Sequence, residues 1–114
     1  MVQKANSALT EDAFLGGRLR LLQPVQGYRA GVDPVLLAAS VPAKSGQRVL
    51  DLGCGVGAAL FCLGCRAPGL SLTGIELQPI YADCARRNAL SNNIEAKVVQ
   101  ADLSKLPPES RQMR

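Results

Sequence analysis

With 114 residues, of which 47% are hydrophobic, the chain is long enough for one domain with a packed core. No apolar run approaches the ~20 residues that a membrane helix needs, and the first residues lack the apolar core of a signal peptide. We therefore expect a cytoplasmic protein with no membrane contact. The net charge of +4 fits either a nucleic-acid partner or an ordinary basic surface, and the absence of histidine removes the commonest general base and metal ligand.

Residues 1–46 are expected to form an N-terminal hairpin and helix segment. We interpret residues 10–15 as a short turn. After a Gly-Gly break, residues 18–23 alternate polar and apolar side chains, which is the pattern of a strand with one buried face. A turn signal then predicts that residues 28–30 return as a second, antiparallel strand. An Asp-Pro pair, typical of a helix start, predicts a helix over residues 35–40.

Residues 47–114 are expected to form an α/β domain, because strand and helix patterns alternate along them. The predicted elements are strand 48–52, helix 58–66, strand 70–76, a helix that begins at Pro79 and ends before Asn92, and strand 95–101. This order requires parallel strands joined by right-handed crossovers. The predicted fold class is therefore α/β, with three parallel strands and crossover helices preceded by a β-hairpin.

Four cysteines are present, and two of them form a CxxC pair, Cys62 and Cys65. A zinc or redox site would need a second ligand pair or a thioredoxin-like context, and the sequence has neither. The CxxC pair also lies inside a predicted buried helix. We therefore predict that the cysteines are free core residues, with no metal site and no disulfide.

The segment Asp51-Leu-Gly-Cys-Gly-Val-Gly57 connects the first predicted parallel strand to the helix that follows it. Its three glycines let the backbone turn tightly and approach a ligand closely. A helix start behind such a loop offers free N–H groups. No Gly-Lys-Ser/Thr follows, so the loop is not a P-loop. The pattern indicates a nucleotide-like ligand, and the alternative is a structural turn that binds nothing.

Each of the three predicted parallel strands ends near an acidic residue. Asp51 closes the first strand, Glu76 ends the second, 19 residues after Gly57, and Asp102 follows the third. An acid about 20 residues beyond a glycine loop is the group that accepts hydrogen bonds from ribose hydroxyls. The alternative is that these acids are solvated caps of their strands.

The Asp51–Gly57 segment resembles the first motif of the class I S-adenosylmethionine-dependent methyltransferases. Glu76-Leu77 resembles their second motif and Ala101-Asp102-Leu103 their third. The resemblance implies a partial Rossmann-like methyltransferase fold and the cofactor S-adenosyl-L-methionine. It also implies that Glu76 holds the ribose, Asp102 the adenine amino group, and Asp51 the amino or sulfonium end. The expected cofactor-binding residues are Tyr28, Arg29, Asp33, Asp51, Gly53, Cys54, Gly55, Gly57, Glu76, Leu77, Asp102 and Leu103.

Residues 27–39 are similar to the segment that precedes the first strand in bacterial tRNA adenine-N6 methyltransferases acting on valine tRNA, and residues 14–19 fit the same group. The resemblance implies that an adenine amino group in tRNA accepts the methyl group. It also implies that residues 28–33 close over the cofactor. The alternative for Tyr28 and Arg29 is packing within the hairpin.

One motif of the amino-methylating families is missing. They carry Asn/Asp-Pro-Pro-Tyr/Phe after the fourth strand, whereas the Pro-Pro pair of this chain, Pro107-Pro108, lies in a loop after the third strand. We therefore predict no catalytic residue within these 114 residues, and a truncated, cofactor-binding portion that is inactive by itself. The edge of strand 48–52 would then pair with another copy, lie under the hairpin, or belong to a longer protein.

Two other functions stay open at this point. A nicotinamide dinucleotide-binding oxidoreductase is allowed by the GxGxG spacing and by Glu76, although Asp51 and Asp102 argue against it. A non-catalytic, methyltransferase-like interaction module is favoured by the missing motif.

Overall fold

The structure, a computed structural model, describes residues 8–25 and 42–105. Its strands are β1 (Leu9–Phe14), β2 (Leu19–Pro24), β3 (Arg48–Leu52), β4 (Ser71–Glu76) and β5 (Ala96–Gln100). Its helices are α3 (Ala58–Arg66) and α4 (Pro79–Ser91), with short 3-10 helices η1 (Leu15–Gly17) and η2 (Leu103–Lys105). Among these residues, no helix combines the length and the hydropathy needed to cross a bilayer.

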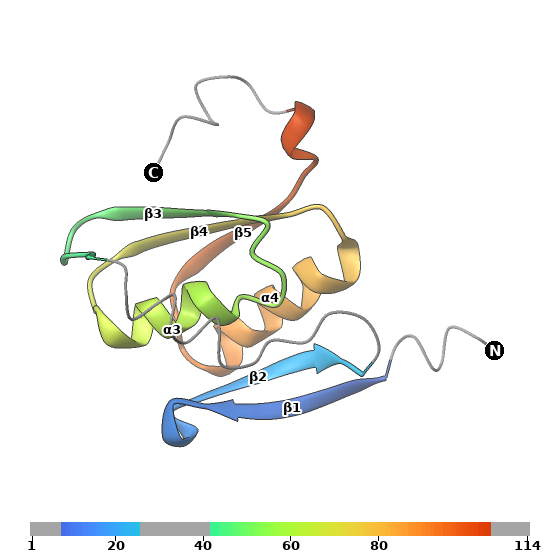
Figure 1. Ribbon diagram of the computed structural model, residues 1–114, viewed down its shortest axis with the longest axis horizontal. Helices are drawn as coiled ribbons and strands as arrows, with labels where there is room; N and C mark the ends of the chain where they lie inside the picture. The colour runs from blue at the N-terminus through green and yellow to red at the C-terminus, as the bar shows by residue number, and fades with distance from the viewer. Residues whose placement is uncertain (1–7, 26–41, 106–114) are drawn as a thin grey trace.

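The described elements form three layers (Figure 1). Strands β3, β4 and β5 make a parallel sheet in the order β3-β4-β5. Helices α3 and α4 cover one face of this sheet, and the β1–β2 hairpin packs against the helices on their other side. The α/β prediction is confirmed: β3 and α3 have the predicted bounds, while β4 and β5 are slightly shorter than predicted.

The hairpin is made of different residues than the sequence predicted. Residues 10–15 are not a turn, because β1 pairs with β2 in antiparallel register from Leu9↔Pro24 to Phe14↔Leu19. The polar side chains of β1 give it no recognisable strand pattern in the sequence. In the structure, polar side chains of β1 interact with those of β2. The Glu11 carboxylate, for example, accepts a hydrogen bond of 2.6 Å from Arg20 Nε. The predicted strand 28–30 and helix 35–40 lie outside the described residues.

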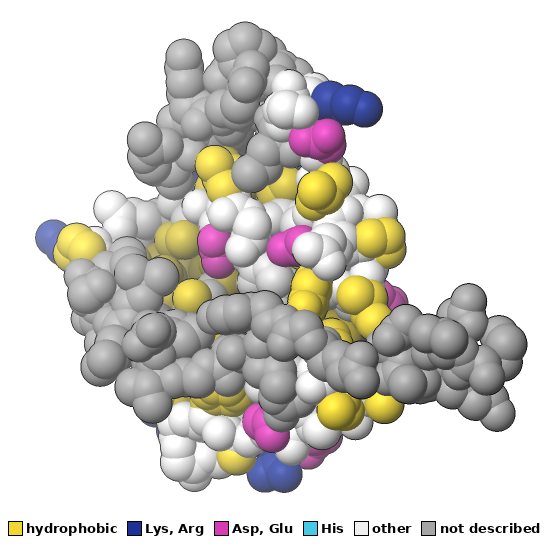
Figure 2. All heavy atoms as spheres, turned by 45° about the vertical axis from the view of Figure 1, so that its right-hand side comes forward, with side chains coloured by type: hydrophobic (Ala, Val, Ile, Leu, Met, Phe, Trp, Pro, Cys, Tyr) yellow, Lys and Arg dark blue, Asp and Glu magenta, His cyan; other side chains and the backbone are white. Residues whose placement is uncertain are grey.

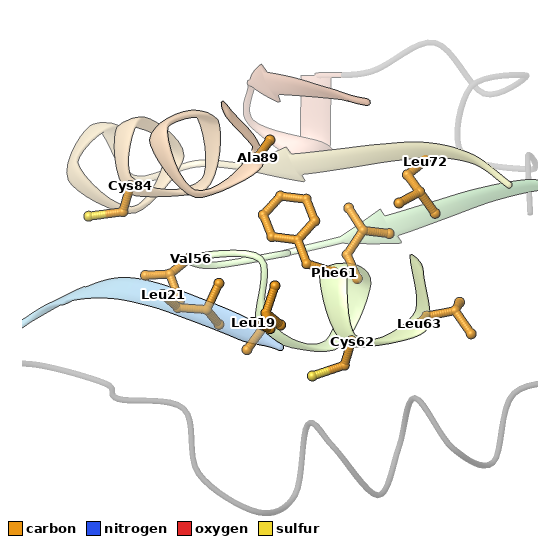
Figure 3. Close-up of a cluster of buried hydrophobic side chains, with 11 residues drawn as sticks. Leu19, Leu21, Val56, Phe61, Cys62, Leu63, Leu72, Cys84 and Ala89 are labelled. Atoms are coloured by element: carbon orange, nitrogen blue, oxygen red, sulfur yellow. The ribbon is translucent and has the colours of Figure 1, made fainter. Parts of the chain in front are cut away.

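The core fills the space between the sheet, the helices and the hairpin (Figure 3). Phe61 of α3 is fully buried and lies in one cluster with Leu19 and Leu21 of β2. The predicted placement in the core agrees with the structure for Cys54, Cys62 and Cys84, which are buried, whereas Cys65 is partly buried; all four are free thiols. Among the described residues, no group of three or more metal-ligating side chains occurs.

Asn88 of α4 and Asn92, the residue that caps the end of α4, attach the hairpin to the helix. Asn88 accepts a hydrogen bond from the Leu22 N–H and donates one to the Leu22 carbonyl, at 2.7 and 3.1 Å. One helical turn later, Asn92 does the same with the N–H and carbonyl of Arg20, at 2.9 and 2.8 Å. These two side chains thus bond the edge of β2 that faces away from β1.

The two outer strands of the parallel sheet differ at their free edges. At β5, Arg86 of α4 donates a hydrogen bond from Nε to the Val98 carbonyl, at 3.3 Å. Strand β3 has β4 as its strand neighbour within the described residues, and the hairpin forms a separate sheet. Of the three alternatives for the β3 edge, cover by the hairpin is wrong for β1 and β2, because these strands bind the helix layer instead. Pairing of this edge with another copy stays a prediction.

Candidate functional site

The glycine loop leads from β3 into α3 and is attached to the neighbouring strand. The N–H groups of Gly53 and Cys54 both donate to the Ile75 carbonyl of β4, at 2.7 and 3.0 Å. The loop then closes on itself through the Gly57 N–H, which donates to the Cys54 carbonyl at 2.9 Å. These bonds fix the loop at the carboxyl edge of the sheet, where ligands of open α/β sheets bind.

The three loop glycines have positive φ angles, 85° at Gly53, 58° at Gly55 and 94° at Gly57, so all three use a backbone conformation that other residues rarely adopt. They differ in what a side chain would meet. A Cβ on Gly57 would overlap the ring of Phe61, whereas a Cβ on Gly53 or Gly55 would have no atom within 4 Å. Gly57 is therefore required by core packing, and the other two border open space.

Glu76 lies at the end of β4, is only 9% exposed and holds two backbone amides. Its Oε1 accepts the Gly55 N–H at 2.8 Å, and its Oε2 accepts the Gln78 N–H at 3.0 Å. It thereby joins the glycine loop to the start of α4. A carboxylate has about four acceptor positions, so each oxygen retains capacity for a hydroxyl of a ligand.

Asp51, the penultimate residue of β3, is a partly buried carboxylate beside Glu76. Burial, followed by the negative charge of Glu76, raises the pKa of Asp51 above its usual range. The ion pairs among the described residues are Arg20–Glu11 and Arg87–Asp83, so neither site acid has a cationic partner there. Two neighbouring, poorly hydrated carboxylates create a site that favours a positively charged ligand.

Cys54 contributes its backbone to the loop and turns its thiol inward. Its side chain fills the space above Gly74, where an added Cβ would lie 2.6 Å from Cys54 Sγ. Burial, together with the charges of Asp51 and Glu76, raises the pKa of Cys54 to about 12, so the thiol stays protonated. The Cys54 side chain is therefore a packing group and not a nucleophile.

The other predicted site residues divide into three groups. Asp102 follows β5, and its Oδ1 accepts hydrogen bonds from the N–H and hydroxyl of Ser104, at 3.0 and 2.8 Å, which lower its pKa. Leu77 follows Glu76 and is 59% exposed, and Leu103 lies in η2. Tyr28, Arg29 and Asp33 lie outside the described residues.

Acidic and hydrophobic side chains lie side by side on the face shown in Figure 2. Two exposed hydrophobic residues lie at the carboxyl edge of the parallel sheet. Leu52 ends β3 and is 40% exposed, and Leu77 follows β4. The carboxylates suit cationic or hydroxyl groups of a ligand, and the leucines suit a flat apolar ring.

The sequence interpretation missed Asn88, which donates a hydrogen bond of 3.0 Å to the Val56 carbonyl of the glycine loop. A signal was present in the sequence. Asn88 falls at helical spacing on the same face of α4 as Cys84 and Ala85, both of which are buried. A polar residue in the apolar stripe of a helix needs internal hydrogen-bond partners, and here it finds them in the hairpin and the loop.

Comparison with known proteins agrees with this geometry. The family described as "Methyltransferase domain" matches residues 49–114. A tRNA1(Val) (adenine(37)-N6)-methyltransferase of Porphyromonas gingivalis is 38% identical in an alignment 94 residues long, which covers 79% of this chain and 37% of that protein. The protein of the same name from Yersinia enterocolitica is 40% identical over 62 residues, 54% of this chain and 25% of that protein. The chain thus spans well under half the length of these relatives.

Solved structures show the same fold. An S-adenosyl-L-methionine-dependent methyltransferase from Thiobacillus denitrificans, in complex with S-adenosyl-L-homocysteine, superposes with a TM-score of 0.56 at 29% identity, over 64% of this chain and 30% of that one. TYW2 of Pyrococcus horikoshii, at 18% identity, superposes with a TM-score of 0.74 over 89% of this chain and 39% of that one. Since the family match covers more than half of the residues, the chain belongs to the methyltransferase domain family.

Proposed function

We propose that the chain binds S-adenosyl-L-methionine at the carboxyl edge of its parallel sheet and serves methyl transfer to an adenine amino group in tRNA. The observation that carries the proposal is the pair Asp51 and Glu76. Two partly desolvated carboxylates lie beside an open glycine loop, and no cation pairs with them among the described residues. S-adenosyl-L-methionine carries a sulfonium, an ammonium and ribose hydroxyls, which are the groups such a site favours.

The residues present fit this cofactor. We assign the ribose hydroxyls to the remaining acceptor positions of Glu76, and the cationic end to Asp51. Gly53 and Gly55 border space that any side chain would occupy, so they leave room for the methionine part. Leu77 offers an apolar surface to the adenine ring, and the oxygen of Asp102 that Ser104 does not bond is a candidate acceptor for the adenine amino group. Tyr28, Arg29, Asp33, Cys54, Gly57 and Leu103 stay in the proposed set of cofactor-binding residues, but no specific cofactor group is assigned to them.

When bound, the cofactor supplies an electrophilic methyl group on its sulfonium. The contribution of this chain is to hold and orient that donor. Glu76 fixes the loop and the ribose together, and Asp51 offsets positive charge at the edge. Positioning of this kind is sufficient for a large part of the rate enhancement of a direct displacement, in which the substrate amine attacks the methyl group.

The nicotinamide alternative is disfavoured by charge as well as by family. A dinucleotide would place its negatively charged pyrophosphate against the glycine loop, close to Asp51 and Glu76. Like charges without an intervening cation repel each other, so this edge is a poor pyrophosphate site. The family match to methyltransferases points the same way.

The proposal of a tRNA substrate rests on the named relatives, since the P. gingivalis and Yersinia proteins are tRNA1(Val) (adenine(37)-N6)-methyltransferases. The net charge of +4 is compatible with a polyanionic partner. Because tRNA is the proposed substrate, we also propose a cytoplasmic location.

We further propose that the chain divides into a hairpin and helix segment over residues 1–46 and a cofactor-binding domain over residues 47–114.

Titration calorimetry of the chain with S-adenosyl-L-homocysteine and with NAD tests the cofactor. We expect saturable heat with the first and none with the second, and the reverse result would overturn the proposal. Methyl transfer from labelled cofactor to valine tRNA by the full-length gene product tests the substrate. Cofactor binding without transfer to any tRNA would instead support the non-catalytic interaction module.

A further inference from the structure

Asn88 is a fully buried polar side chain at which three parts of the fold meet. Its Oδ1 accepts the Leu22 N–H of the hairpin at 2.7 Å. The two protons of its Nδ2 go to the Leu22 carbonyl, at 3.1 Å, and to the Val56 carbonyl of the glycine loop, at 3.0 Å. Both protons and the oxygen are therefore used, and one amide group connects α4, β2 and the loop.

The glycine loop is held from two sides at adjacent residues. The Gly55 N–H is bound by Glu76, and the Val56 carbonyl is bound by Asn88. The Val56 side chain is buried in the same cluster as Leu21 of the hairpin (Figure 3). A movement of the hairpin relative to α4 would therefore shift the peptide groups of Gly55 and Val56, which border the proposed cofactor site.

Asn92, the C-cap residue of α4, supplies a comparison. Its side chain bonds the N–H and carbonyl of Arg20 as Asn88 bonds those of Leu22, but its other side-chain hydrogen bonds go to Asn88 and Ser91 in the last turn of α4. Asn92 therefore docks the hairpin without touching the glycine loop. Variants of the two asparagines can therefore distinguish an effect on the hairpin alone from an effect on both the hairpin and the glycine loop.

We propose that Asn88 is a positioning residue that couples docking of the β1–β2 hairpin to the conformation of the glycine loop, and thereby to cofactor affinity. The second part of this inference rests on the proposed function, whereas the first does not. A coupling of this kind is reciprocal, so a ligand that orders the loop also strengthens hairpin docking. The hairpin then acts on the proposed cofactor site through Asn88 and the glycine loop.

The test compares Asn88→Asp with Asn92→Asp in the full chain. Each substitution keeps an oxygen for the strand N–H and replaces the donating NH2 by an oxygen that faces carbonyls. Amide exchange followed by nuclear magnetic resonance reports each region separately. The Ala82 N–H, bonded to the Gln78 carbonyl in the first turn of α4, serves as a reference amide that neither asparagine side chain bonds.

For Asn88→Asp we expect at least tenfold faster exchange of the Gly55 and Gly57 amides relative to Ala82, and at least tenfold weaker binding of S-adenosyl-L-homocysteine. Asn92→Asp loosens the hairpin at Arg20 but leaves all three side-chain hydrogen bonds of Asn88 in place. For this variant we therefore expect faster exchange at Arg20, and loop exchange and affinity within about twofold of wild type. Equal effects of both variants on the loop would show that Asn88 is not the link between hairpin and loop, and no effect of Asn88→Asp would show that the loop is held without it; either result would overturn the inference.

A folding defect and a failure of the proposed function can both be told apart from a failure of the coupling. If Asn88→Asp does not fold, Asn88→Ser is compared with Asn92→Ser by the same criteria, since it removes the donors without burying a charge. If the wild-type chain binds no S-adenosyl-L-homocysteine, the proposed function fails while the exchange measurements still decide whether Asn88 positions the loop.

Discussion

The Gly55 amide and the Glu76 carboxylate, 21 residues apart in the chain, are joined by a hydrogen bond of 2.8 Å. Replacing Glu76 by Gln turns one carboxylate oxygen into an NH2 group, which faces a backbone N–H that it cannot bond. Leaving a buried donor unsatisfied destabilises the fold by about 1–3 kcal/mol. We expect this loss in urea unfolding, and at least tenfold weaker binding of S-adenosyl-L-homocysteine by calorimetry.

Glu95→Gln is the matched control for this experiment, because it makes the same change of charge at an exposed residue that precedes β5. Both stability and affinity should stay close to wild type. If the Glu76 and Glu95 variants behaved alike, the hydrogen bonds of Glu76 would have no energetic role.

Gly57→Ala tests the packing of the loop against Phe61. Both Gly57 and Gly46 have φ above +90°, but a Cβ on Gly46 would meet no atom within 4 Å. Gly46→Ala therefore measures the backbone strain alone, about 1–2 kcal/mol. Gly57→Ala should lose about a further 1–3 kcal/mol to overpacking. Chemical denaturation gives both values, and equal losses would contradict the overlap with the Phe61 ring.

Gly53→Ala separates ligand space from stability. Its φ of +85° and open surroundings resemble those of Gly46, so the two alanine variants should lose similar amounts of unfolding free energy. The new methyl group would, however, occupy the space assigned to the cofactor. We expect calorimetry to show weaker cofactor binding for Gly53→Ala and unchanged binding for Gly46→Ala.

Asp51→Asn should stabilise the unliganded chain while weakening ligand binding. Because the pKa of Asp51 is raised on folding, its charge opposes the folded state at neutral pH. The gain from Asn should shrink as the pH falls through the raised pKa, where Asp51 takes up its proton. Unfolding at pH 7 and in the acid range checks the sign. Asp83→Asn, which removes an exposed partner of Arg87, should not stabilise the chain.

Alkylation should distinguish the four cysteines. Thiolates are the reactive species, and burial raises the pKa of Cys54 to about 12 and that of Cys62 to about 11. Cys65 is the partly exposed cysteine, so iodoacetamide at pH 8 should label it first. Peptide mass spectrometry at successive times gives the order in which the four cysteines are alkylated. Rapid labelling of Cys54 without denaturant would show that the glycine loop opens readily.

The pKa shifts of the buried thiols also predict alkaline destabilisation. In the unfolded chain these thiols ionise near the ordinary value of 9.0, whereas in the folded chain Cys54 and Cys62 retain their protons. The unfolding free energy should therefore fall as the pH rises above about 9. Cys54→Ala should flatten this dependence in denaturant titrations at pH 8 to 10.

The parallel sheet could be predicted because its signals are local. Glycines mark the end of β3, a continuous apolar run marks α3, and Pro79 marks the start of α4. The spacing of Glu76 from the glycine loop was enough to propose it as a site residue. Its bonds to two backbone amides could not be predicted, since they depend on how the loop and α4 meet in space.

The hairpin could not be predicted in the same way. Thr10, Glu11 and Asp12 give β1 the composition of a turn, and the strand forms because it pairs with β2. The ion pair between Arg20 and Glu11 across the ladder is exposed and adds little. Asn88 was overlooked for a related reason. Its position on an apolar helix face signals an internal partner, but the sequence does not say which segment supplies it.

The docking of β2 onto Asn88 and Asn92 has a consequence for how copies of this chain meet. Exposed strand edges invite aggregation by strand addition, and amide side chains that bond an edge in place of a neighbouring strand remove that opportunity. The edge of β2 is shielded in this way, and Arg86 blocks part of the edge of β5. Strand β3 has no comparable protection among the described residues, so unwanted self-association should begin there and could be suppressed by a charged substitution on that one strand.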